Sequence, residues 1–271
     1  VALERVFPGD KKIVNMCDQP VNLLQSFAKV LGIRRQDIVP EYVGLNHFGW
    51  FTKLTDRDGN DLLAPLREKI LSEGFLPADA AERAASWLHT SAMGQTIRRE
   101  FPDYVPITYL QYYLYPEQVV AQLDPDHTRT EEVRNGREKR VFTQCRQAAR
   151  QGSTKGLTIA KSEVHADMIV EVASSIAFDK GELFIMITRN NGTVSNFHED
   201  AMVETAAHVG ANGVTAVPFG KIDVFMKGLM EGQYAYEHLT VDSYFEGSYK
   251  KALQALPLNR TLVDAQKARA V

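Results

Sequence analysis

Residues 41–54 read EYVGLNHFGWFTKL, with two runs of apolar and β-branched residues on either side of a glycine-flanked segment. Such runs favour extended chain, so we expect strands at 41–45 and 50–54. Three further apolar runs are predicted to be extended: 12–16, 182–188 and 202–218, the last with a glycine turn. The chain therefore has enough strand for a sheet of several members.

Helical patterns occupy most of the remaining sequence. Apolar residues recur at helical spacing from Val21 to Leu31, after Pro20 at a favourable first-turn position and before Gly32. Further helices are expected at 61–73, 78–100, 116–122, 128–151 and 165–178, and over most of 221–271. Because strands and helices are mixed without a regular βαβ rhythm, the predicted fold class is α+β.

Composition excludes several classes of protein. With 44% hydrophobic and 24% charged residues, the 271-residue chain matches ordinary globular domains and not disordered ones. A net charge of −3 gives no electrostatic case for nucleic acid or an anionic membrane as partner. Two cysteines cannot form a disulfide framework, and no run reaches the roughly 18 apolar residues of a membrane span. These features predict a cytoplasmic protein.

Cys17 and Asp18 follow the predicted strand at 12–16, and strand ends are places where sites are built. For this pair taken alone the structural interpretation is favoured, because free cysteine is commonly a buried small hydrophobe and aspartate before Gln19-Pro20 suits a helix cap. His47 lies between Gly44 and Gly49. A lone histidine is usually a hydrogen-bonded core residue, although glycine neighbours suggest close approach of a ligand or of backbone.

A thiolate and an imidazole with open coordination positions would suit a divalent transition metal that also takes substrate oxygens. The segment 101–115 adds five tyrosines, most of which we expect to be packing residues. A tyrosine can act as a base only if a nearby cation lowers its pKa from about 10, so its candidacy depends on the metal. Arg129 begins a predicted helix, where free amides and a guanidinium suit a phosphate; the alternative is a solvated first turn.

Four motifs in order, NMCDQP (15–20), GLNHFGW (44–50), TYLQYYLYP (108–116) and DHTR (126–129), resemble glycoside hydrolase family 4. NNG (190–192) and KGLMEGQ (227–233) extend the resemblance over nearly the whole chain. The resemblance implies a fold like the C-terminal domain of lactate and malate dehydrogenases. It also implies that 1–271 is the metal and substrate domain, with 1–18 the tail end of a Rossmann-like half.

The resemblance assigns roles to six residues: Cys17 and His47 bind the metal, Asp18 is the acid, Tyr109 the base, and Arg129 and Asn46 bind substrate. The Cys-Asp pair is similar to that of the 6-phospho-α-glucosidase branch, which implies a phosphorylated disaccharide or α-glucoside such as maltose 6-phosphate as substrate. The family uses NAD and a divalent metal, typically Mn²⁺. Its implied mechanism oxidises C3 of the sugar, removes the C2 proton, expels the C1 substituent, adds water and returns the hydride.

The chain departs from the family pattern at one point: it contains no GxGxxG or other recognisable nucleotide-binding loop. It corresponds to roughly the C-terminal three-fifths of a family member, so we expect the chain alone to lack the hydride acceptor and to fail in hydrolysis. An alternative is an inactive remnant serving as a sugar-phosphate-binding or oligomerisation module. A metal-dependent dehydrogenase of the lactate/malate type is less favoured, because Asp18 would have no role. The resemblance also implies a homo-oligomer.

Overall fold

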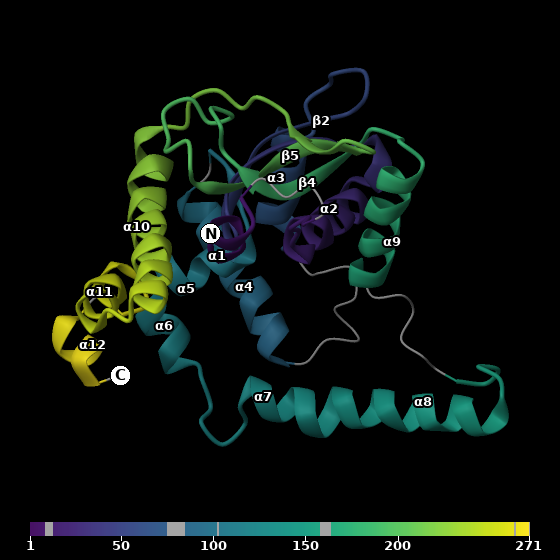
Figure 1. The fold of residues 1–271 in the computed structure, drawn as a ribbon. Helices are drawn as coiled ribbons and strands as arrows, with labels where there is room; N and C mark the ends of the chain where they lie inside the picture. Colours follow the sequence, from purple (N-terminus) through teal and green to yellow (C-terminus); the bar gives the residue numbers. More distant parts are fainter. Residues whose placement is uncertain (9–12, 75–84, 102, 158–163, 263, 271) are drawn as a thin grey trace.

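The computed structural model describes residues 1–8, 13–74, 85–101, 103–157, 164–262 and 264–270 (Figure 1). The strands are β1 (Val39–Leu45), β2 (Phe48–Thr55), β3 (Val105–Pro106), β4 (Glu182–Arg189), β5 (Met202–Gly210) and β6 (Gly213–Ala216). The α-helices are α1 (Ala2–Val6), α2 (Asp18–Leu31), α3 (Leu63–Glu73), α4 (Ala85–Glu100), α5 (Gln111–Leu114), α6 (Pro116–Ala121), α7 (Arg129–Glu131), α8 (Lys139–Gln151), α9 (Val164–Ala177), α10 (Val224–Glu246), α11 (Tyr249–Ala255) and α12 (Ala265–Ala270). Short 3-10 helices lie at Arg35–Asp37, Thr108–Leu110 and Leu256–Leu258, and a π-helix joins α7 to α8 at Glu132–Glu138.

One sheet organises the molecule, with strand order β3-β2-β1-β5-β4 and β6 paired to β5. Every pairing between these strands is antiparallel. Antiparallel strands and helices of this kind confirm the α+β class predicted from the sequence. Because β1 and β5 are neighbours, residues some 160 positions apart lie side by side at the centre of the sheet, as Val43 and Thr205 do.

Helix α2 is fixed to the sheet by its apolar face. Phe27 is fully buried and meets Phe51 of β2 edge-on, with ring centroids 5.3 Å apart. Phe48, Trp50 and Tyr42 are buried in the same core. Burial of a large aromatic side chain contributes roughly 3 kcal/mol. The N-terminus of α2 is therefore held at a fixed place relative to β1 and β2, and this matters because Cys17 and Asp18 lie there.

The structure corrects two expectations near the N-terminus. The run 12–16 is not a strand within its described part, because Asn15 forms only a single antiparallel bridge to Ile187; Lys12 lies outside the described residues. Helix α2 begins at Asp18 and is capped by Cys17, whose sulfur accepts the Gln19 N–H. Asp18 is thus in the first helical turn and is not the cap.

The remaining helices follow the predicted order with shifted ends. The helix expected at 78–100 is described from Ala85, since 75–84 lie outside the described residues. The helix expected at 128–151 is one continuous helical run. It is π-helical over Glu132–Glu138 and α-helical on either side. Among the helices described, none is both long enough and apolar enough to cross a bilayer.

Candidate functional site

The tip of the β1–β2 hairpin carries Asn46 and His47 in a two-residue connection between paired Leu45 and Phe48. His47 has a φ of 61°, a left-handed conformation that costs a non-glycine residue about 1 kcal/mol or more. Strained residues of this kind concentrate at binding and catalytic sites. The left-handed backbone therefore marks His47 as a candidate site residue independently of the sequence motif.

The glycines beside this turn have a structural role. Gly44 and Gly49 face each other across the two strands, and a Cβ on Gly44 would collide with the Gly49 backbone. A Cβ on Gly49 would collide with the Tyr42 hydroxyl. Of the two explanations that the sequence left open for these glycines, the described contacts support close approach of backbone and of Tyr42.

At the start of α2, Cys17 is buried and Asp18 is half-buried. The Asn22 amide donates a hydrogen bond of 2.7 Å to Oδ2 of Asp18, which fixes the carboxyl group. The other oxygen, Oδ1, lies 3.9 Å from the Cys17 sulfur. The thiol and the carboxyl group are thus adjacent, and Asn22 sets the orientation of the latter.

Tyr109 lies in the 3-10 helix Thr108–Leu110, which is tied to both preceding segments. The Gln19 side chain of α2 donates to the Thr108 hydroxyl, and the Ile107 N–H donates to the Gly49 carbonyl at 3.0 Å. The Tyr109 ring meets the His47 ring edge-on, with centroids 4.6 Å apart. The structure therefore brings three distant segments, at 17–19, 46–49 and 107–109, into one cluster.

Glu204 of β5 is a member of this cluster that the sequence did not reveal. It is fully buried, and it accepts a hydrogen bond of 2.8 Å from the Tyr42 hydroxyl. Burial raises the pKa of Glu204 to about 7, assisted by the charge of Asp18 and opposed by Tyr42 and Asn46. The only sequence signal is an acidic residue in the otherwise apolar run MVETAAHV, since carboxylates are almost never fully buried without partners.

The electrostatic surroundings keep both candidate metal ligands uncharged. Burial raises the pKa of Cys17 to about 12, with a further contribution from Glu204, while hydrogen bonds from Gln19 and Asn46 oppose the rise. Desolvation lowers the pKa of His47, and the charge of Asp18 opposes this. Neutral imidazole is the form that binds metal, and a coordinated thiol loses its proton because of the cation's charge.

The donor set fits a metal that is completed by other groups. Among the described residues, no group of three or more His, Cys, Asp or Glu side chains is placed to hold an ion. A closed structural zinc site needs four protein ligands, so Cys17 and His47 do not form one. A sulfur and a nitrogen donor with open positions match a borderline-soft divalent ion that also takes oxygens from a substrate.

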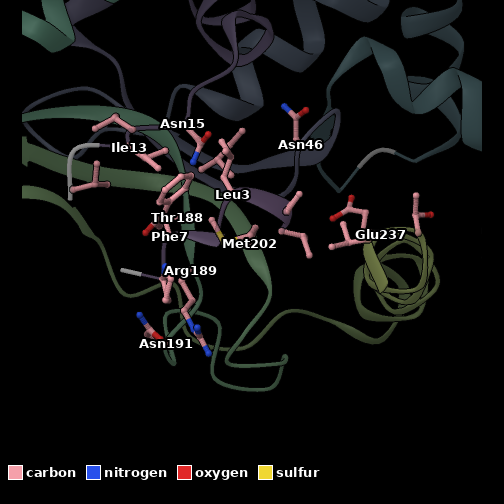
Figure 2. Close-up of a pocket in the computed structure, with 18 of the residues that line it drawn as sticks. Leu3, Phe7, Ile13, Asn15, Asn46, Thr188, Arg189, Asn191, Met202 and Glu237 are labelled. Atoms are coloured by element: carbon pink, nitrogen blue, oxygen red, sulfur yellow. The ribbon is translucent and has the colours of Figure 1, made fainter. Parts of the chain in front are cut away.

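A cavity of about 910 Å³ opens beside the cluster (Figure 2). Its walls come from α1, β4, the start of β5 and α10, and they include the polar side chains of Asn15, Arg189 and Glu237. Among the predicted site residues, Asn46 alone is in the described lining. Because Asn46 also hydrogen-bonds toward Cys17, this residue links the cavity to the cluster.

Arg129 lies elsewhere. It is the first residue of α7, and its guanidinium donates to Glu132 one turn later at 2.9 Å. Figure 1 shows α7 at one end of a helical run that lies apart from the β1–β2 hairpin. The described contacts thus support the solvated first turn, and its phosphate-binding role stays a prediction.

Comparison with known proteins adds independent findings. The model of the family 4 glycosyl hydrolase C-terminal domain matches residues 42–262. The phospho-alpha-glucosidase PagL of Clostridium acetobutylicum is 43% identical over 99% of this chain and 61% of its own length. The maltose-6'-phosphate glucosidase of Bacillus subtilis is 42% identical over 100% of this chain and 60% of its own length.

Among solved structures, a 6-phospho-alpha-glucosidase from gut microorganisms, crystallised with NAD and Mn²⁺, superimposes with a TM-score of 0.94. It is 45% identical, and the match covers 99% of this chain and 61% of that one. The chain therefore spans about three-fifths of the length of the relatives it matches. This likeness confirms the fold predicted from the motifs.

Proposed function

Because this chain belongs to the family 4 glycosyl hydrolases, we propose that it supplies the metal-binding and acid/base residues of a 6-phospho-α-glucosidase that uses NAD and Mn²⁺. The observation that carries the proposal is the cluster of Cys17, Asp18, His47 and Tyr109, built by three distant segments. Residues 1–18 would then be the end of a preceding dinucleotide-binding half.

Cys17 and His47 are the residues that would hold the ion, with sugar oxygens completing its coordination. When bound, the metal supplies Lewis-acid polarisation of these oxygens, and NAD accepts a hydride from C3 and later returns it. Asn46 contacts the substrate at the edge of the cavity. The assignment of the phosphate to Arg129 rests on the family resemblance alone, because α7 lies apart from the β1–β2 hairpin. The assignment of an α-linked phosphoglucoside rests on the Cys-Asp pair and on the names of the two relatives.

Tyr109 is the base in this proposal. As a phenolate it takes the proton from C2 of a sugar that carries a carbonyl group at C3, and its contact with His47 keeps the ring beside the metal ligands. The electron pair of the C2–H bond forms a C1–C2 double bond as the C1–O bond breaks. Asp18, with one oxygen held by Asn22, gives a proton to the departing oxygen. Water then adds at C1, giving a proton to Asp18, while Tyr109 returns a proton to C2.

The proposal can be tested on the 271-residue chain without a hydride acceptor. An α-glucoside 6-phosphate that is already oxidised to the ketone at C3 needs only the acid/base half of the reaction. In D₂O with Mn²⁺, we expect the chain to exchange the C2 hydrogen for deuterium and to release the aglycone, as followed by NMR. The unoxidised glucoside with NAD should not be hydrolysed.

Controls separate the possible outcomes. Omission of Mn²⁺ should stop exchange, whereas Cys145→Ser, at the exposed second cysteine, should leave it unchanged. Exchange that persists without metal, or its absence under all conditions in a folded chain that binds Mn²⁺, would contradict the acid/base assignment.

The second candidate is a sugar-phosphate-binding module without chemistry, and the polar cavity beside Asn46 favours it. Thermal stabilisation by Mn²⁺ together with a glucoside 6-phosphate, but with no C2 exchange, would establish this alternative.

A further inference from the structure

Helix α10 forms one wall of the cavity that Asn46 also lines. The side chain of Asp223 caps the start of this helix by accepting the Met226 N–H at 2.8 Å, and Met226 and Met230 are buried in the core. The wall is therefore fixed relative to the sheet. Four residues on one face of the helix belong to the described lining: Tyr236, Glu237, Thr240 and Val241.

Glu237 supplies the one carboxyl group in the described lining of this cavity. Gln233, one turn earlier, donates a hydrogen bond of 3.0 Å to Oε1 of Glu237, and this is the only hydrogen bond to the carboxyl group from the described part of the chain. A carboxylate can accept about four hydrogen bonds. Desolvation raises the pKa of Glu237, and the Gln233 hydrogen bond opposes the rise. The carboxyl group is thus withdrawn from water with most of its acceptor positions left for a donor in the cavity.

Glu237 lies near a different part of the hairpin tip from Asp18. The Tyr113 ring meets the ring of Phe48 at 4.7 Å between centroids, and the pKa of Tyr113 is raised by burial and then by the charge of Glu237. The charge of Asp18 acts instead on the pKa values of Cys17 and His47. Figure 2 shows Glu237 of α10 and Asn46 of the hairpin on the same side of the cavity. A ligand beside the hairpin tip can therefore face Asp18 at one end and Glu237 at the other.

The proposed function leaves one hydroxyl group of the reacting sugar ring without a partner. The oxygens of C2 and C3 go to the metal, C6 carries the phosphate, and the C1 oxygen departs beside Asp18. The remaining C4 hydroxyl lies across the pyranose ring from C1. A hydroxyl group donates to an ionised carboxylate in a charge-assisted hydrogen bond, which is stronger than one between neutral groups.

We propose that Glu237 is a substrate-binding residue that accepts a hydrogen bond from the C4 hydroxyl group of the glucoside. This inference rests on the proposed function, because the position of the sugar ring is taken from it. A site built to bind a hydroxyl group rejects an analogue that lacks it, since the buried acceptor is then left unpaired. Glu237 is thus a specificity-determining residue. A ribose hydroxyl group of NAD offers the same chemistry, and the test below distinguishes the two sources.

A comparison of two ligands on two chains tests the contact. The ligands are methyl α-glucoside 6-phosphate and its 4-deoxy analogue, titrated calorimetrically in the presence of Mn²⁺ and without NAD, so that neither is turned over. Loss of the C4 hydroxyl group should weaken binding to the unmodified chain about tenfold or more. In Glu237→Ala, the two ligands should bind within about twofold of each other, because the partner of the hydroxyl group has been removed. Alanine favours the helix, so α10 should stay intact.

Glu231→Ala is the matched control. Glu231 belongs to the same helix, pairs with His198 at 2.7 Å and is not in the described lining of the cavity. In this variant the 4-deoxy analogue should still bind about tenfold more weakly than the parent glucoside. Glu237→Gln, which keeps the size of the side chain and an acceptor for Gln233, should give a smaller difference between the ligands than the unmodified chain does.

Three outcomes would overturn the inference: a full-sized difference between the ligands in Glu237→Ala, no binding of the glucoside to the unmodified chain at millimolar concentration, or weaker binding of NAD to Glu237→Ala with glucoside binding unchanged. The last would assign Glu237 to the ribose. The C2 exchange experiment keeps the proposed function separate. Normal exchange together with a ligand difference that ignores Glu237 would count against this inference alone, whereas a difference that requires Glu237 without any exchange would count against the proposed chemistry alone.

Discussion

At the tip of the β1–β2 hairpin, the exposed residues Asn46 and His47 are followed by Phe48, which is fully buried. Helix α8, in contrast, has exposed residues and no buried one. The hairpin tip is held by a hydrogen bond and a ring contact to the distant segment 107–109. In the helical run 129–151, Arg129 forms an ion pair with Glu132, one turn later in the same run. The difference teaches that the first region is organised by contacts within the described chain, whereas α8 has no buried residue to organise it.

Cys17→Ser should have the largest effect on the organised region. Serine is a good helix cap and accepts the same backbone N–H, so α2 should stay intact. Loss of the sulfur donor should raise the dissociation constant for Mn²⁺ at least 100-fold and abolish metal-dependent C2 exchange. Titration by electron paramagnetic resonance of free Mn²⁺ measures the first effect. Unchanged Mn²⁺ affinity in this variant would remove Cys17 from the metal site.

Tyr109→Phe should separate chemistry from binding. The ring and its contact with His47 are retained, so Mn²⁺ affinity should stay within about twofold of the original. Loss of the general base should slow C2 exchange about 10²–10⁴-fold. Deuterium incorporation by NMR measures this rate. If exchange persists at the original rate, another residue is the base.

The sequence predicted the organised region well because its signals are local. The strands at 41–45 and 50–54 were expected from apolar runs, and the structure confirms both with slightly longer bounds. Helix α2 was expected from its apolar spacing and terminal Gly32, which is in the left-handed conformation. Cys17, His47 and Tyr109 were chosen from motifs, and the structure places their segments together; their roles stay predictions.

What the sequence missed depends on distant packing. Glu204 is 162 positions from Tyr42, its hydrogen-bond partner, and the apolar run around it is the only local sign of its burial. The run at 12–16 has the composition of a strand, but a strand also needs a neighbouring strand to pair with. In the described part of this run, Asn15 forms a single bridge, to Ile187. Arg129 was expected near the site, yet its position depends on the helical run 129–151, in which α8 has no buried residue.

Asp18→Asn should have a selective effect. An amide cannot give a proton to the departing oxygen, so release of an alkyl aglycone from the C3-oxidised substrate should slow about 10²-fold. An activated aryl aglycone leaves without protonation and should be released at nearly the original rate. Release of the two aglycones by one variant is measured side by side. Equal losses on both substrates would indicate that Asp18 is structural.

Glu204→Gln should change how stability depends on pH. The carboxyl group has a usual pKa near 4.5 and a folded-state pKa of about 7, so the folded chain holds a proton that the unfolded chain releases between these values. The free energy of unfolding should therefore fall by about 3 kcal/mol as pH rises from 4.5 to 7. Glutamine can still accept from Tyr42 but does not titrate, so the variant should lack this fall.

Denaturant unfolding of both chains at several pH values measures the contribution, because the other titrating groups are common to both and cancel in the difference. Parallel stability curves for the two chains would show that Glu204 is ionised alike in the folded and unfolded states.

The smallest effect is expected for Phe142→Ala in α8. At concentrations where the chain is monomeric, an exposed side chain without buried neighbours should change the free energy of unfolding by less than about 0.5 kcal/mol. Phe51→Ala in β2, where the ring is fully buried, should cost about 3–5 kcal/mol. If Phe142→Ala lowered the free energy of unfolding of the monomer by more than 2 kcal/mol, α8 would pack against its own chain. The contrast between the two regions would then fail.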